Sequence, residues 1–241
     1  MNNINVSKVL SEEGILSVII RNHNKRNALS DSIKLELEKI ALELRDNTDI
    51  KAVILSGDKG NFCSGNDIKE KNAFGDGLDL KDARQKNRIG LRMCDAWTNI
   101  PQITVASIEG ACIGGGVSLA LSCDFRFCKP NSYFYVPEIE LGFTYAWGTI
   151  PKLVSILGPS KAKLITIACK KLNAKTLSEW GLCEEISDNP LISSTEFLEE
   201  IILKPLVAQQ MVKESINRLT NLNQISTLEQ DQVLLTRKFK H

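Results

Sequence analysis

Histidine and aromatic residues are scarce in this chain of 241 residues, which has two histidines and 6% aromatic residues. The two are His23, in a polar run, and His241. A Ser–His–Asp or Cys–His nucleophile would depend on His23, and we expect that side chain to be an ordinary solvated histidine. A zinc site would need mostly cysteines, yet the seven cysteines contain no C-x-x-C pair. The sequence therefore predicts neither a histidine-activated nucleophile nor a metal site.

The chain also lacks a large net charge and long apolar runs. Lys and Arg number 30 against 29 Asp and Glu, which gives a net charge of +1 and excludes polyanion binding by bulk charge. No apolar run reaches the roughly 20 residues of a membrane helix, and the first residues have no signal-peptide pattern. The odd number of cysteines favours free thiols in a reducing compartment. We expect a cytoplasmic protein without a membrane partner.

The composition is that of an ordinary globular protein, with 43% hydrophobic and 24% charged residues. Apolar runs and helical periodicity alternate, which predicts an α/β fold. Ser30 is the expected N-cap of the first helix. Strands are expected at 14–20, 52–55, 103–108 and 125–128, and helices at 31–44, 80–97 and 117–121. From about residue 151 the chain is expected to be mostly helical, with breaks at 158–159 and 189–190.

A glycine run follows one of the expected buried strands. Gly114, Gly115 and Gly116 lie between the strand and a helix, where unpaired amides at the positive end of the helix could hold an anion or a developing oxyanion. A P-loop would need lysine at position 116, and a dinucleotide-binding motif would need glycine at position 119, where Leu119 stands. Both are excluded, and close helix packing is the alternative explanation of the glycines.

Two further segments could carry chemistry. Residues 62–68 read Phe-Cys-Ser-Gly-Asn-Asp-Ile, where a tight turn at Gly65 would expose the amide of Asn66. Residues 136–142 place Glu138 and Glu140 in a mainly apolar stretch. A carboxyl group in such surroundings has a raised pKa and suits proton transfer near neutral pH. A plain loop and a solvent-facing glutamate are the alternatives.

These three segments, in this order, resemble the enoyl-CoA hydratase/isomerase (crotonase) family. Four parts of the sequence match its motifs: residues 27–29, 62–68, 110–124 and 137–142. The resemblance covers roughly residues 10 to 235. It implies an α/β fold with a crotonase-like ββα spiral core over residues 1–190 and a helical C-terminal trimerisation region over residues 191–241, shorter than usual for the family. It also implies a homotrimer or a dimer of trimers.

The resemblance implies a coenzyme A thioester as substrate, with no cofactor apart from the coenzyme A that the substrate carries. Nucleic-acid binding is not expected. The family's two oxyanion-hole amides fall on Asn66 and Gly115, and one of its two carboxylates falls on Glu138. The other position holds Ser118. Further substrate-binding positions implied are Lys25, Arg26, Ala28, Ser64, Gly65, Asp67, Ile68, Gly114, Ser118, Tyr145 and Trp147.

A single carboxylate favours one reaction of this family. Hydration of a 2-enoyl thioester is efficient with two carboxylates around the water, whereas one base can move a double bond from C3 to C2. We therefore expect a Δ3,Δ2-enoyl-CoA isomerase that uses Glu138. Hydratase, lyase or decarboxylase activity remains open, as does a non-catalytic acyl-CoA-binding or RNA-binding role.

Three features of the sequence can each be interpreted in two ways. Tyr145 and Trp147 depart from the family pattern, and they either reshape the acyl pocket or simply pack. A basic helical stripe is either a solvated face or a contact for phosphates, those of coenzyme A before those of RNA, since no aromatic residues are interleaved for base stacking. It consists of Lys81, Arg84, Arg88 and Arg92. An apolar stripe faces either a neighbouring subunit or the core; it consists of Phe197, Leu198, Ile201 and Ile202.

Overall fold

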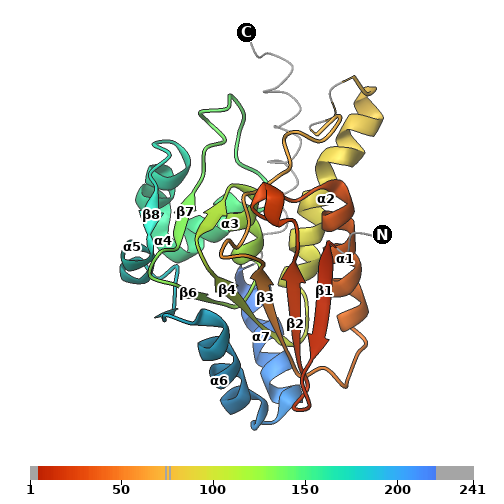
Figure 1. The fold of residues 1–241 in the computed structure, drawn as a ribbon, viewed down its shortest axis with the longest axis vertical. Helices are drawn as coiled ribbons and strands as arrows, with labels where there is room; N and C mark the ends of the chain where they lie inside the picture. The colour runs from red at the N-terminus through yellow and green to blue at the C-terminus, as the bar shows by residue number, and fades with distance from the viewer. Residues whose placement is uncertain (1–4, 74, 76, 221–241) are drawn as a thin grey trace.

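The computed structural model describes residues 5–73, 75 and 77–220, and its centre is a six-stranded sheet (Figure 1). The strand order is β1-β2-β3-β4-β6-β9, and all neighbours are parallel except β1 and β2. The strands are β1 Val6–Leu10, β2 Ile15–Ile20, β3 Ala52–Gly57, β4 Ile103–Ile108, β6 Phe125–Cys128 and β9 Glu185–Ile186.

A smaller sheet and a set of helices complete the fold. The three-stranded sheet has the order β5-β7-β8, formed by Ala111–Ile113, Tyr133–Tyr135 and Leu172–Asn173. The helices are η1 His23–Lys25, α1 Asp31–Leu44, α2 Leu80–Thr98, α3 Gly115–Ala120, α4 Thr149–Thr166, α5 Ala174–Glu179, α6 Pro190–Ile202 and α7 Leu206–Thr220.

Helices cover both faces of the large sheet, which explains the continuous apolar run in β3. Alternate residues of a strand point to opposite faces. Val53 and Leu55 belong to the main core with α1 and α2, whereas Ala52 and Ile54 pack with α6. A parallel sheet buried on both faces needs apolar residues on each.

The apolar stripe of α6 packs on this sheet. Leu198 is fully buried, and Phe197 packs edge-on against Phe125 with ring centroids 5.0 Å apart. Ile201 and Ile202 lie partly buried in the same cluster. The stripe therefore packs against the core, as one of the two interpretations expects.

The predicted helix cap and the two predicted helix breaks are confirmed. The Ser30 hydroxyl accepts a hydrogen bond from the Ile33 amide and caps α1. Gly158 interrupts α4 with φ 74° and ψ 166°, and Asn189 caps α6, whose first residue is Pro190. The short strands β1, β5, β7, β8 and β9 were not expected from the sequence, because two to five residues carry too little periodicity.

All seven cysteines lie in the described part of the chain, and they are buried free thiols, as the sequence predicts. Among the described helices, none is both long and apolar enough to cross a membrane.

Candidate active site

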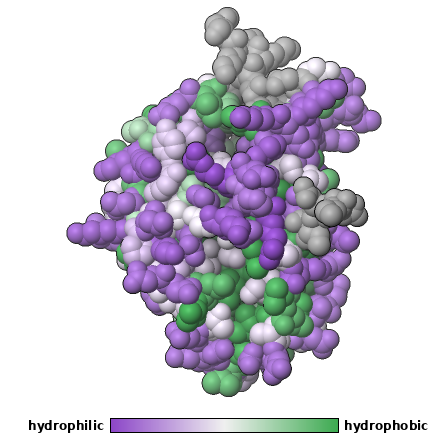
Figure 2. Space-filling model, in the orientation of Figure 1, coloured by the Kyte–Doolittle hydropathy of each residue, from purple (hydrophilic) through white to green (hydrophobic). Residues whose placement is uncertain are grey.

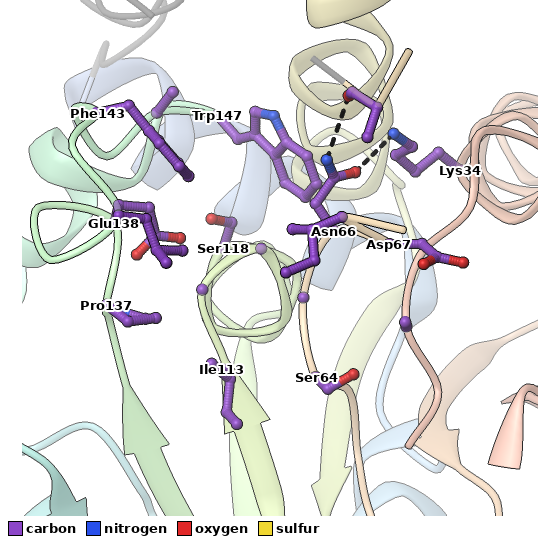
Figure 3. A pocket seen from close by; sticks show the side chains of 18 of the residues that line it. Lys34, Ser64, Asn66, Asp67, Ile113, Ser118, Pro137, Glu138, Phe143 and Trp147 are labelled. Atoms are coloured by element: carbon purple, nitrogen blue, oxygen red, sulfur yellow. Dashed lines mark hydrogen bonds between the residues drawn. The ribbon is translucent and has the colours of Figure 1, made fainter. Parts of the chain in front are cut away.

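A cavity of about 450 Å³ lies beyond the carboxyl ends of several parallel strands (Figure 3). Its walls come from the segments that follow β2, β3, β5 and β7, together with α1 and α2. Ligand sites in α/β folds form at this end of the sheet. Segments that lie far apart in the sequence, from residue 24 to residue 147, are therefore neighbours around this cavity.

Backbone pairing brings the two glycine turns together. Residues 61–63 run parallel to β5: the Cys63 amide donates to the Ala111 carbonyl at 2.9 Å, and the Ile113 amide donates to the Cys63 carbonyl at 2.9 Å. The next turn, at Gly65, has φ +88°, and a β-carbon there would lie 2.7 Å from the Ile113 oxygen and 3.2 Å from the Gly115 nitrogen. Only glycine permits both the angle and the close approach.

The result is a pair of adjacent amides without partners. Within the described part of the chain, the N–H groups of Asn66 and Gly115 donate to no protein acceptor. Gly115 is the first residue of α3, where amides point out of the helix. Two such donors side by side can stabilise negative charge on one ligand oxygen.

The carboxyl group of Glu138 enters the same cavity. A tight turn fixes its backbone, because the amides of Leu141 and Phe143 both donate to the Glu138 carbonyl at 3.1 Å. Its Oε1 lies 2.5 Å from where a β-carbon on Gly114 would be, and its Oε2 is buried with no hydrogen-bond partner among the described residues. Burial raises the pKa of Glu138 from 4.5 to about 7. Both protonation states are therefore accessible near neutral pH.

Ser118, at the position of the family's other carboxylate, is enclosed by hydroxyl groups. It is buried, its hydroxyl donates to the Tyr145 hydroxyl at 3.1 Å, and Thr149 donates to it at 2.7 Å. The Tyr145 hydroxyl in turn donates to the Gly114 carbonyl at 2.9 Å. Burial raises the pKa of Tyr145, so this network stays uncharged.

All of the residues predicted for the site line this one cavity, and their roles stay predictions. The lining includes Lys25, Arg26, Ala28, Ser64, Gly65, Asn66, Asp67, Ile68, Gly114, Gly115, Ser118, Glu138, Tyr145 and Trp147. Asp67 pairs with Lys25 at 2.6 Å. Glu140 does not line the cavity; it is exposed and accepts a hydrogen bond from the Tyr135 hydroxyl.

The predicted basic stripe of α2 does not line this cavity. Arg92, for example, pairs with Glu38 at 2.9 Å. Two other residues of the same helix, Lys86 and Asn87, do line it. A contact of the stripe with this site is therefore not supported.

Lys34 is a cavity residue that the sequence reasoning missed. Its side chain is 4% exposed, pairs with Asp31 at 2.6 Å and donates to the Asn66 side-chain oxygen at 2.9 Å. Burial lowers the pKa of Lys34 despite these partners. A signal was present, since Lys34 precedes Leu37 and Ala41 by three and seven residues and so lies on the apolar face of α1.

The cavity thus combines two amides without partners among the described residues with the carboxyl groups of Glu138 and of Asp67, which is paired with Lys25. Comparison with known proteins identifies the class to which this fold and cavity belong. The sequence model described as "Enoyl-CoA hydratase/isomerase" matches residues 11–241. The chain belongs to the enoyl-CoA hydratase/isomerase family.

Relatives carry several activities. The chain is 30% identical over 215 residues to an ethylmalonyl-CoA decarboxylase of Rattus norvegicus, covering 85% of this chain and 69% of that protein. It is 30% identical to a peroxisomal Δ(3,5)-Δ(2,4)-dienoyl-CoA isomerase of Arabidopsis thaliana, covering 73% and 66%. It is 27% identical to a short-chain-enoyl-CoA hydratase of Clostridium acetobutylicum, covering 87% and 80%.

Solved structures agree on the fold. An enoyl-CoA hydratase/isomerase from Mycobacterium paratuberculosis superposes with a TM-score of 0.87 at 20% identity, covering 98% of this chain and 95% of that one. The mixed α/β, crotonase-like fold predicted from the sequence is confirmed. The specific reaction is not fixed by relatives whose activities differ.

Proposed function

We propose that this acyl-CoA enzyme is a Δ3,Δ2-enoyl-CoA isomerase with Glu138 as its proton-transfer group. One observation carries the proposal: beside the paired amides, Glu138 has a buried carboxyl oxygen with no partner among the described residues, while the other carboxylate position holds the enclosed Ser118. Isomerisation needs one base, and Glu138 can supply it, whereas the Asp67 carboxylate is paired with Lys25. No cofactor beyond the coenzyme A of the substrate is needed.

In this reaction the amides of Asn66 and Gly115 hold the thioester oxygen. The Glu138 carboxylate removes a proton from C2 of the 3-enoyl group, and the electrons move into the thioester to give a dienolate. The two amides stabilise the negative charge that develops on the oxygen. Protonated Glu138 then returns the proton at C4, which leaves a double bond between C2 and C3.

Decarboxylation is the second candidate, and the ethylmalonyl-CoA decarboxylase relative favours it. There the bond between C2 and the carboxylate carbon breaks, and carbon dioxide leaves. The resulting enolate is the same kind of ion, held by the same two amides. Protonated Glu138 would deliver a proton to C2, so the enzyme would need the acid form of this group rather than the base.

The experiment that separates these reactions is incubation with 3-enoyl, 2-enoyl and malonyl-type thioesters, with the products resolved by chromatography and mass. Conversion of the 3-enoyl thioester as the fastest reaction supports the proposal. Faster release of carbon dioxide, or faster hydration, contradicts it. The Glu140→Gln variant is a matched control, because Glu140 lies outside the cavity, and it should react at the native rate.

A homotrimer, or a dimer of trimers, is proposed for the assembled enzyme on the strength of the family resemblance. A cytoplasmic location is likewise a proposal that rests on the sequence.

A further inference from the structure

We propose that Trp147 is the specificity-determining residue of this site, closing its acyl end so that short-chain acyl thioesters are selected. The inference rests on the proposed function in taking an acyl thioester as the ligand, and it goes further by naming the class of acyl group. Trp147 lines the cavity, and Figure 3 shows its indole ring extending into the space between Glu138 and Lys34.

Two glycines from different helices accommodate the indole ring. A β-carbon on Gly90 of α2 would lie 2.0 Å from Cε2 and 2.3 Å from Cζ2 of Trp147. A β-carbon on Gly115 of α3 would lie 2.2 Å from Cζ3 and 2.7 Å from Cη2. The two nearest atoms, Cε2 and Cζ3, are opposite corners of the six-membered ring, so the ring lies between the two helices. A side chain larger than that of glycine at position 90 or 115 would overlap it.

The backbone of Trp147 indicates that the ring is held in place at an energetic cost. Its φ is +61°, in the left-handed region that a bulky residue rarely adopts. Residues in such conformations persist where the surroundings fix them, and they gather at functional sites. The surroundings here include the Lys34 ammonium group, 5.8 Å from the centroid of the Trp147 ring.

The position of the ring determines what it excludes. Because the indole contacts Gly115, whose amide is proposed to hold the thioester oxygen, the ring lies beside the carbon atoms next to the thioester. A long chain extending toward α2 would overlap the ring. A short acyl group would instead pack on it and gain from the aromatic surface.

The test is calorimetric titration with butanoyl-CoA and decanoyl-CoA, two unreactive saturated thioesters. Where a chain is accommodated, each added buried CH2 strengthens binding by about fourfold. For the native protein we expect decanoyl-CoA to bind no more tightly than butanoyl-CoA, within about threefold. In Trp147→Ala the preference for decanoyl-CoA should rise by at least about 10-fold, since several CH2 groups would then be buried. An unchanged ratio in a folded Trp147→Ala protein would overturn the inference.

Three further variants test whether the effect is specific to Trp147. Trp180→Ala removes a tryptophan that lies outside this cavity, and it should leave the ratio of the two affinities unchanged. Gly90→Ala should push the indole toward Gly115 and weaken butanoyl-CoA binding by about 10-fold, the cost of one poorly fitted group of ~1.4 kcal/mol. The double variant Gly90→Ala/Trp147→Leu should recover that loss. Failure to recover it would contradict the packing argument.

These binding measurements are independent of the reaction. If no isomerisation is detected while the chain-length ratio changes in Trp147→Ala as expected, the proposed reaction fails and the inference stands. If neither thioester binds the native protein, both fail.

Discussion

At the scale of single residues, the proposed chemistry depends on removing one carboxyl group from water. Glu138 loses its hydration without gaining a partner for Oε2, so its charged form is disfavoured and its pKa rises to about 7. Glu140 lies two residues away but is exposed and bonded to Tyr135. The two glutamates belong to the same turn, but Glu138 lines the cavity whereas Glu140 is exposed to solvent.

The first prediction concerns the acid–base role of Glu138. Glu138→Gln preserves size and removes the base, so the kcat for isomerisation should fall at least ~100-fold while thioester binding stays nearly unchanged. In the native enzyme kcat/KM should rise with pH through about 7, because the reaction needs the carboxylate. A profile that falls through this pH would instead identify the protonated acid as the active form, as decarboxylation requires.

The second prediction concerns stability. Since the pKa of Glu138 is raised in the folded state, that state retains a proton which the unfolded chain loses above about pH 4.5. The free energy of unfolding should therefore fall as pH rises from about 4.5 to 7, by up to about 3 kcal/mol from this group. Denaturant unfolding of the native and Glu138→Gln proteins at pH 4.5 and pH 8 would measure it. The variant should gain relative stability at pH 8, and equal pH dependence of the two proteins would contradict the burial argument.

The third prediction concerns the amide of Asn66. Asn66→Pro removes this donor, and kcat should fall by about 100- to 1,000-fold, as for other lost oxyanion donors. Asn66→Ala keeps the amide but removes the side-chain oxygen that accepts from Lys34 at 2.9 Å, so a smaller loss of about 10-fold is expected. Steady-state kinetics on folded proteins, checked by circular dichroism, would measure both. Equal losses in the two variants would show that the side chain, not the amide, is what matters.

At the scale of elements, the site is assembled by parallel pairing. The extended residues 61–63 run beside β5, and this pairing places the turns at Gly65 and Gly114 against each other. The sequence could predict each turn, because a glycine run between a strand and a helix has a known consequence for amides. The sequence also predicted strands β2, β3, β4 and β6 and the helices that flank them.

Two other features of the site could not be predicted from the sequence, because they depend on contacts between residues far apart in the chain. The burial of Lys34 depends on Asp31 and Asn66, and the latter lies 32 residues away along the chain. The fit of Trp147 depends on Gly90 and Gly115, which periodicity cannot connect with it. Contacts of this kind are set by tertiary packing, and local patterns do not record them.

The fourth prediction concerns the short helix α3. Ser118 is the family position for another carboxylate, but its hydroxyl is enclosed by Tyr145 and Thr149. Ser118→Glu would force a carboxyl group into that network, so we expect a loss of about 3 kcal/mol in the free energy of unfolding and no gain in hydration. Ser118→Ala is the matched control and should lose about 1 kcal/mol. A stable Ser118→Glu protein that hydrates 2-enoyl thioesters would contradict this account of the site.

At the scale of the whole molecule, apolar surface remains exposed after the fold is complete. Figure 2 shows hydrophobic side chains gathered over the lower part of one face, where Figure 1 places α6, α7 and the lower ends of the strands. On α7, Val207 is 68% and Met211 62% exposed. A cavity of about 710 Å³ adjoins this helix, lined also by Ile156 of α4 and Ile201 of α6. Exposed apolar side chains gathered in this way are typical of contacts between proteins.

The last prediction is that this surface contacts a second copy of the chain in the proposed trimer. Light scattering at micromolar concentration should give three times the monomer mass, or six times for a dimer of trimers. Val207→Lys/Met211→Lys places two charges on the exposed face of α7 and should dissociate the assembly while the helical content stays the same, because burying unpaired charges at an interface is costly. Leu80→Lys, at a 76% exposed residue that begins α2 at the opposite end of the molecule (Figure 1), is the matched control and should stay trimeric. A native protein with the monomer mass would refute the assembly, and a trimer that tolerates both lysines would place the contact on another face.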